Sequence, residues 1–233
     1  MTVSGKNVLY MDTAGAELML GISVDGTVQF RHREGPGSQR YHSALLIPAI
    51  QQGLKQLGLS IQQLDAVCLN AGPGSFTGIR TGIATGRTLA QFLPGLGSVL
   101  HVFNTFELLA GHGLTEVSHH PAVAIYLDAR RERAYHAMVG FDSTGPFYVK
   151  DPTLAALSDC LPERIPLLVS ASLEALLLLP DGNLQTVESL NVFTPEVMMH
   201  LLGAYGHHFR YPWQEVKPLY LQEPSITQRK TQT

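Results

Sequence analysis

The residues that could do chemistry gather in one stretch, "NAGPGSFTGIRTGIATGRTLA", which covers residues 70–90. A glycine-rich turn that leads into a helix can hold a phosphate on its free backbone amides. Three enzymatic templates for such a turn do not fit. A Walker loop is missing its lysine, because no lysine follows Gly74 before Lys150. A dinucleotide fingerprint would need a glycine at Thr77, and a nucleophile elbow would need glycines two residues on either side of Ser75.

The helix that follows carries glycines at a regular spacing. Gly78, Gly82 and Gly86 are four residues apart and therefore share one helical face, which Ala90 continues. Each glycine in a helix interior costs about 1 kcal/mol relative to alanine. A face without side chains lets another element approach closely, and the dispersion contacts along that seam can offset the cost. Two interpretations stay open: a subunit interface, or tight packing inside the chain's own core.

A few residues are candidates for a position near a nucleotide. The amides at the helix start, from Gly74 through Ser75 to Thr77, could receive an anion, although no lysine or arginine lies on that turn. Asp12, in "DTAG" at the end of a predicted strand, is a further candidate. Its alternative role, which we favour, is to cap the turn that follows the strand.

Composition and charge restrict the class of protein. The chain has 233 residues, of which 45% are hydrophobic, so it can form one large domain or two small ones with a sizeable core. The net charge is −3 and the basic residues are scattered, which predicts no electrostatic patch for gripping nucleic acid by itself. Cys68 and Cys160 are expected to be buried free thiols in a reducing compartment. With no signal sequence and no apolar run of membrane length, a cytoplasmic location is expected.

Apolar spacing predicts alternating strands and helices in the first half. Asp25-Gly26 is a hairpin signal between two strands. Pro48 lies inside a helical pattern, where we expect a kink or a later helix start. Asn104 and Glu107 form a capping box at the start of another helix. The expected strands are residues 7–14, two strands within 16–34, 64–72 and 97–103, and the expected helices are 43–57, 76–92 and 104–114.

The second half begins near Pro121 and repeats the coarse order of elements. Residues 122–151 predict three antiparallel strands, and a strand at 166–170 and helices at 172–179 and 194–209 follow. Because both halves begin with three antiparallel strands and continue with helices and strands, we infer a structural duplication. The expected domains are residues 1–115, residues 116–223 and a polar tail at 224–233.

Five segments together resemble one protein family. They are "VLYMDTA", "YHSALLIPAI", "GPGSFTGIRTGIATGRTLA", "LDARRERAYHAMVGFD" and "VKPLYLQEPSIT". The third segment resembles the signature of the TsaB family, formerly YeaZ, of bacterial tRNA-modification proteins, and the other four are similar to family segments in the same order. One position departs from the pattern, since Arg133 stands where the family usually carries glutamate.

The resemblance implies an α/β protein of the actin-like/Hsp70-like ATPase (ribonuclease-H-like) fold, with two lobes that each have a mixed sheet flanked by helices. It also implies a role in forming threonylcarbamoyladenosine in tRNAs that read ANN codons. In that pathway a YrdC-type enzyme makes threonylcarbamoyl-AMP and TsaD transfers the group to tRNA. A TsaB-like chain would bind and activate TsaD as a heterodimer, with the ATPase TsaE joining them.

The resemblance carries expectations about ligands and surfaces. In isolation such a chain is expected to form a homodimer, to meet tRNA only through the complex and to make no membrane contact. No cofactor or metal is expected on the chain alone, and ATP or ADP is expected at the complex interface. The family's contact with TsaD falls on helices 43–57 and 76–92, which favours the interface interpretation of the glycine face. The expected partner-binding residues are Leu46, Ile50, Gly78, Ile79, Gly82, Ile83 and Gly86.

An independently active enzyme of the same fold is the alternative. A metallopeptidase-like site needs two histidines four residues apart on a helix, and none of the ten histidines is so placed. An ATP-using kinase needs a phosphate-binding hairpin in both lobes. In the second lobe "LDARRERAYH" has arginines where close backbone approach needs glycine. We therefore expect a partner subunit without catalytic residues of its own.

Overall fold

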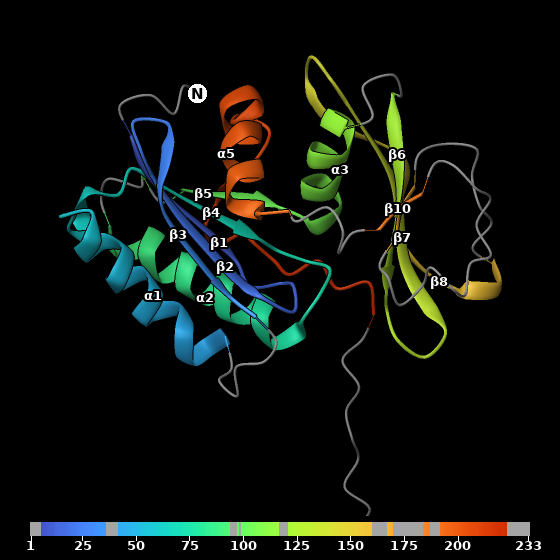
Figure 1. Cartoon of the computed structure of the whole chain (residues 1–233), viewed down its shortest axis with the longest axis horizontal. Coiled ribbons are helices and arrows are strands. Elements are labelled where there is room, and N and C mark those ends of the chain that lie inside the picture. The colour runs from blue at the N-terminus through green and yellow to red at the C-terminus, as the bar shows by residue number, and fades with distance from the viewer. Residues whose placement is uncertain are drawn as a thin grey trace, which may run out of the picture.

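The structure, a computed structural model, describes residues 6–35, 42–93, 97, 99–116, 121–159, 167–169, 184–186 and 192–222. Two β-sheets are flanked by helices, two of which lie between the sheets (Figure 1). The predicted helix at 172–179, Cys160 and the tail at 224–233 lie outside the described residues. No helix in the described ranges combines the length and the apolar character that a membrane crossing requires.

The first sheet has six strands in the order β11-β5-β4-β1-β2-β3. β1, β2 and β3 are antiparallel, whereas β4 and β5 run parallel to β1. β1 and β4 are buried along nearly their whole length, as expected for central strands with apolar sequences. The strands are β1 (Asn7–Asp12), β2 (Leu18–Val24), β3 (Thr27–Glu34), β4 (Ala66–Asn70), β5 (Val99–Phe103) and β11 (Arg210–Pro212).

The second sheet repeats the order of the first. Its strands run β10-β9-β6-β7-β8, which matches β5-β4-β1-β2-β3 position by position, with the same antiparallel and parallel pairings. The predicted duplication is therefore confirmed. The strands are β6 (Ala122–Asp128), β7 (Arg133–Asp142), β8 (Gly145–Ala156), β9 (Leu167–Val169) and β10 (Leu184–Thr186).

Helices cover both faces of the first sheet. α1 (His42–Gln56) and α2 (Phe76–Phe92) pack on one face, and α5 (Thr194–Tyr205) packs on the other (Figure 1). α3 (Thr105–Glu116) lies between the sheets and contacts β6, β7 and α5. Two short 3₁₀ turns, η1 (Ile61–Gln63) and η3 (Leu157–Asp159), complete the described elements.

The two sheets share one of the two hydrophobic cores. The first core fills the space between the first sheet and α1 and α2. The second core joins Tyr10 and Cys68, on the opposite face of the first sheet, to Ile125 and Val139 of the second sheet through side chains of α3 and α5. Because apolar surface from both sheets is buried together, the lobes stabilise each other.

The C-terminal part of the chain returns to the first sheet. β11 pairs with β5, and Val216 lies in the first core. α5 also belongs spatially to the first sheet, because it packs on β1 and β2. A boundary near residue 116 thus separates the two sheets along the sequence. It leaves α5 and β11 in the C-terminal part of the chain, although α5 packs on the first sheet and β11 belongs to it.

Most local predictions are confirmed, with two differences. Asp25 and Gly26 form the hairpin turn, with φ of 53° and 79°. α1 contains Pro48 and begins at His42, so the later start is wrong, and the kink, the other expected outcome, stays a prediction. The helix expected at 194–209 ends at Tyr205, because the chain turns there and forms β11, which was not predicted.

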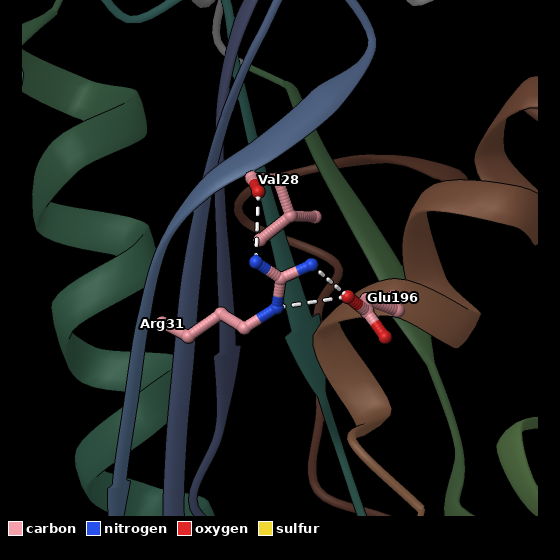
Figure 2. A network of polar contacts seen from close by, with 3 residues as sticks. All are labelled: Val28, Arg31 and Glu196. Carbon is pink, nitrogen blue, oxygen red and sulfur yellow. Dashed lines mark hydrogen bonds and ion pairs between the residues drawn. The ribbon is translucent and has the colours of Figure 1, made fainter.

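An ion pair connects α5 to the edge of the first sheet. Both Nε and Nη2 of Arg31, on β3, donate to Oε1 of Glu196 on α5, with an Nε–Oε1 distance of 2.9 Å (Figure 2). Nη1 of Arg31 also donates to the carbonyl oxygen of Val28, at 3.1 Å. Both side chains are exposed, so we assign the pair no more than about 1 kcal/mol of stability.

The turn between β6 and β7 is strained. Arg130, Arg131 and Glu132 have φ of 62°, 54° and 56°, in the left-handed region that favours glycine. Each such residue costs on the order of 1–2 kcal/mol. Asp128 stabilises the turn, since its Oδ1 accepts from the Arg130 N–H at 2.7 Å.

We predict that Glu132→Gly stabilises the protein. Glycine removes the left-handed strain but makes the unfolded chain more flexible, so the net gain should be roughly 0.5–1 kcal/mol, or a few degrees in Tm. Glu132→Ala is the matched control, since alanine removes the same carboxylate without relieving the strain. Equal melting temperatures of the two variants would contradict the interpretation.

Candidate functional site

The glycine face of α2 lies against the chain's own first sheet. Gly78, Gly82, Gly86 and Ala90 are all buried. A Cβ at Gly78 would overlap the carbonyl oxygen of Thr13, and a Cβ at Gly82 would lie 2.5 Å from the Oγ1 of Thr13. A Cβ at Gly86 would lie 2.6 Å from a methyl carbon of Leu69. The missing side chains therefore allow α2 to approach the end of β1 and the strand β4.

The partner-binding residues predicted from the sequence are corrected by this packing. All seven lie in the core, so none of them offers a surface to another polypeptide. The predicted helical spacing is right, but these residues point toward the core, because the first sheet covers the apolar and glycine positions of α1 and α2. The buried residues are Leu46, Ile50, Gly78, Ile79, Gly82, Ile83 and Gly86.

Hydrogen bonds join α2 to the turn after β1. The Oγ1 of Thr13 donates to the carbonyl oxygen of Gly78 at 2.8 Å. The Ser75 N–H donates to the carbonyl oxygen of Ala14 at 2.7 Å, and the Oγ of Ser75 accepts from the Gly78 N–H at 3.2 Å. Two amides at the start of α2 are therefore already used inside the chain.

The carboxylate of Asp12 is engaged in a buried polar network. Its Oδ1 accepts from the Ala14 N–H at 2.9 Å and from Nδ2 of Asn70 at 3.1 Å. The side chains of Asn70 and Thr105 are hydrogen-bonded, and Oγ1 of Thr105 donates to the carbonyl oxygen of Pro73 at 2.8 Å. Asp12 thus caps the turn after β1, the role that we favoured from the sequence.

The residues expected near a nucleotide are only partly accessible. Gly74, Ser75 and Thr77 are exposed at the start of α2, whereas Asp12 is buried and 5% exposed. Proximity of these four residues to a nucleotide stays a prediction. The backbone amides of Ala14 and Ser75 already donate within the chain, so fewer amides at this edge can bind an anion.

The outward face of α2 is a second face of mostly small residues. Thr77, Arg80, Ala84, Thr88 and Gln91 are exposed and follow the three- and four-residue spacing of one helical face. Three of these five side chains are alanine or threonine. Because these three side chains are small, a partner helix could approach this face closely. The sequence suggested that role for the glycine face.

The neighbouring helix α1 adds apolar surface to this face. Ile47 is 48% exposed, and Ala44 and Pro48 beside it are also exposed. Together with the five outward residues of α2, these three residues form what we call the outer face. α1 and α2 also contact each other on the same side of the first sheet.

The C-terminal segment borders the outer face. Nη2 of Arg87, on α2, donates to the carbonyl oxygens of Val216 at 2.6 Å and Gln214 at 3.3 Å. The ring of Tyr220 stacks on that of Phe76 with a centroid distance of 4.9 Å. No local sequence pattern could predict these contacts, because the partners are more than 120 residues apart.

A buried carboxyl group lies at the junction of the lobes. The capping box at the start of α3 is confirmed, since Oε2 of Glu107 accepts from the Asn104 N–H at 2.9 Å and Oδ1 of Asn104 accepts from the Glu107 N–H at 3.0 Å. The hydroxyl of Tyr148, on β8, accepts from Nδ2 of Asn104 at 2.6 Å and donates to Oε1 of Glu107 at 3.3 Å. Burial raises the pKa of Glu107 from its usual 4.5 to about 7, although these hydrogen bonds oppose the shift.

Two sheets with five strands in matching order, the helices that flank them and the shared core define an actin-like, two-lobed α/β protein. A family model described as TsaD, tRNA N6-adenosine threonylcarbamoyltransferase, matches residues 36–145, less than half of the 233-residue chain. The structure of YeaZ from Pseudomonas aeruginosa has the same fold, with a TM-score of 0.72 at 20% identity, and the match covers 93% of this chain and 100% of that one.

Two curated relatives carry the same printed name, tRNA threonylcarbamoyladenosine biosynthesis protein TsaB. The chain is 28% identical over 159 residues to that of Escherichia coli, covering 68% of this chain and 65% of the relative. It is 33% identical over 103 residues to that of Haemophilus influenzae, covering 44% and 42%. The matches thus span less than two thirds of either relative. The chain is therefore similar in sequence to two proteins named TsaB, and it shares its fold with YeaZ from Pseudomonas aeruginosa.

We predict that Gly78→Ala destabilises the protein. Alanine gains about 1 kcal/mol of helix propensity, but its methyl group must displace backbone at Thr13, and overpacking of this kind costs roughly 1–3 kcal/mol. Gly86→Ala is the matched control, because the side chain that it meets, Leu69, can change rotamer. Thermal melts should rank Gly78→Ala clearly below Gly86→Ala. The reverse order would mean that the contact between α2 and the Thr13 backbone can accommodate a methyl group.

We predict that Glu107→Gln removes a pH dependence of stability. A carboxyl group whose pKa is raised on folding stabilises fully below about pH 4.5, and that contribution is lost as the pH rises through 7. The loss for the wild type should be on the order of 2–3 kcal/mol. Chemical denaturation of both proteins at pH 5 and pH 8 measures it, and parallel profiles would contradict the assignment.

Proposed function

We propose that the chain is a non-catalytic subunit that binds and activates a TsaD-type transferase during formation of threonylcarbamoyladenosine in tRNAs that read ANN codons. The relatives named for threonylcarbamoyladenosine biosynthesis support the pathway. The partial match to the transferase family model is consistent with two related chains that pair in one assembly. TsaE joins this complex, ATP or ADP binds at its interface, and tRNA meets the chain only through the assembled complex.

The polar network supports the non-catalytic role. An ATP-using protein of this fold needs a phosphate-binding hairpin with open backbone amides in both lobes. Here Asp12 accepts two internal hydrogen bonds, and the Ala14 carbonyl takes the Ser75 amide. In the second lobe, Arg130 and Arg131 stand in the corresponding turn between β6 and β7.

The observation that carries the partner proposal is the exposed outer face of α1 and α2. Its central residue Ala84 is small, and Ile47 supplies an apolar anchor at its side. A specific interface buries about 800 Å² on each partner, which the outer faces of two helices can provide. Without the transferase, the same face supports a homodimer.

The alternative is an independently active ATP-using or metal-dependent enzyme. It requires that the purified chain hydrolyse ATP or retain stoichiometric metal after gel filtration. Either result, obtained without a transferase subunit present, would end the proposal of a non-catalytic subunit.

We predict that Ala84→Arg abolishes binding to the transferase subunit. A long charged side chain at the centre of the outer face prevents close helix approach, so co-elution should fall at least tenfold. The melting temperature should stay within a few degrees of the wild type, because position 84 is exposed.

Two controls make this test specific. Ala204→Arg places the same substitution on an exposed position of α5, across the first sheet, and should leave binding intact (Figure 1). Gly82→Leu should instead collapse the melt, because its side chain would meet Thr13. If Ala84→Arg binds as well as Ala204→Arg does, the outer face is not the interface.

A further inference from the structure

The turn between β6 and β7 concentrates positive charge. Arg130 and Arg131 are exposed at its tip, Arg133 is half-buried where β7 begins, and Glu132 is the acidic residue among them. Three of the sixteen basic residues thus lie within four positions, in a chain whose net charge is −3. The expectation of scattered charge overlooks this local concentration.

Backbone hydrogen bonds hold the turn that carries these side chains. The Ala129 N–H donates to the carbonyl oxygen of Arg133 at 3.0 Å, and the Arg133 N–H donates to that of Arg130 at 3.2 Å. The tip residues between them are held at positive φ, where glycine fits better than arginine. Backbone strain that is retained together with a long charged side chain suggests a use for that side chain.

The two exposed guanidinium groups are not used inside the part of the protein that the structure describes. Within those residues, the side chains of Arg130 and Arg131 make no hydrogen bond or ion pair, and Arg130 acts only electrostatically, on Tyr135. Their guanidinium groups are therefore available to an external ligand, and the planar guanidinium fork matches the oxygens of a phosphate or carboxylate group.

We propose that Arg130 and Arg131 bind phosphate groups of the tRNA backbone in the assembled transferase complex. The inference rests on the proposed function, since tRNA is the substrate of that complex. An arginine pair on a rigid turn positions a nucleic acid without reading its sequence. The turn belongs to the second sheet, whereas α1 and α2 cover the first sheet (Figure 1).

The test uses the complex of this chain with the transferase subunit. The probe is fluorescently labelled, unmodified tRNA that reads an ANN codon, and anisotropy is followed over a series of salt concentrations. The double variant Arg130→Ala/Arg131→Ala should bind about tenfold more weakly, and the slope of log affinity against log salt should fall by roughly 2. Arg130→Lys/Arg131→Lys should retain most of the affinity, and Arg210→Ala, at an exposed arginine of β11, should change it less than about twofold.

Three results would overturn the inference. The double alanine variant could bind tRNA with unchanged affinity and salt slope. It could instead lose co-elution with the transferase subunit, which would make the arginines a protein contact. Finally, wild type but not the variant could bind ADP or inorganic phosphate while tRNA affinity stays the same, which would identify a small phosphate ligand. Because co-elution is measured in the same samples, failure of this inference is distinguishable from failure of the proposed function.

Discussion

The close approach of α2 to the end of β1 is the constraint on which the rest of the structure depends. It brings the Oγ1 of Thr13 within 2.8 Å of the carbonyl oxygen of Gly78, a distance that a side chain at that position of the helix would prevent. Buried polar groups are costly without partners, so Thr13 needs this acceptor. The same seam places the start of α2 under the turn after β1 and directs the other side of the helix to the solvent.

This seam changes the physical argument for a partner subunit. Glycines spaced four apart are compatible with an interface, but here the chain itself fills the space that they leave. What remains for a partner is the outer face, where Ala84 and Thr88 are small and accessible. The proposed function therefore rests on the named relatives and on this outer face, and no longer on the glycines.

The sequence predicts which elements form and which residues share a face better than it predicts which face points to the core. Alternating apolar runs and turn signals were sufficient for the duplication, the hairpin at Asp25 and the capping box at Asn104. Helical spacing shows which residues share a face but not which face meets the sheet, which is why the glycine face was assigned to a partner. β11 and the contacts of Arg87 join residues more than a hundred positions apart, and no local pattern specifies them. The pKa of Glu107 likewise depends on burial between two lobes.

Thiol labelling at the outer face tests the central claim most directly. Thr88→Cys, made in a Cys160→Ser background, places a reactive group on the outward side of α2, while Cys68 is buried. We expect rapid labelling of the introduced thiol when the isolated chain is dilute enough to be monomeric, and strong protection once the transferase subunit is bound. Equally rapid labelling in the bound complex would show that the partner does not cover this face.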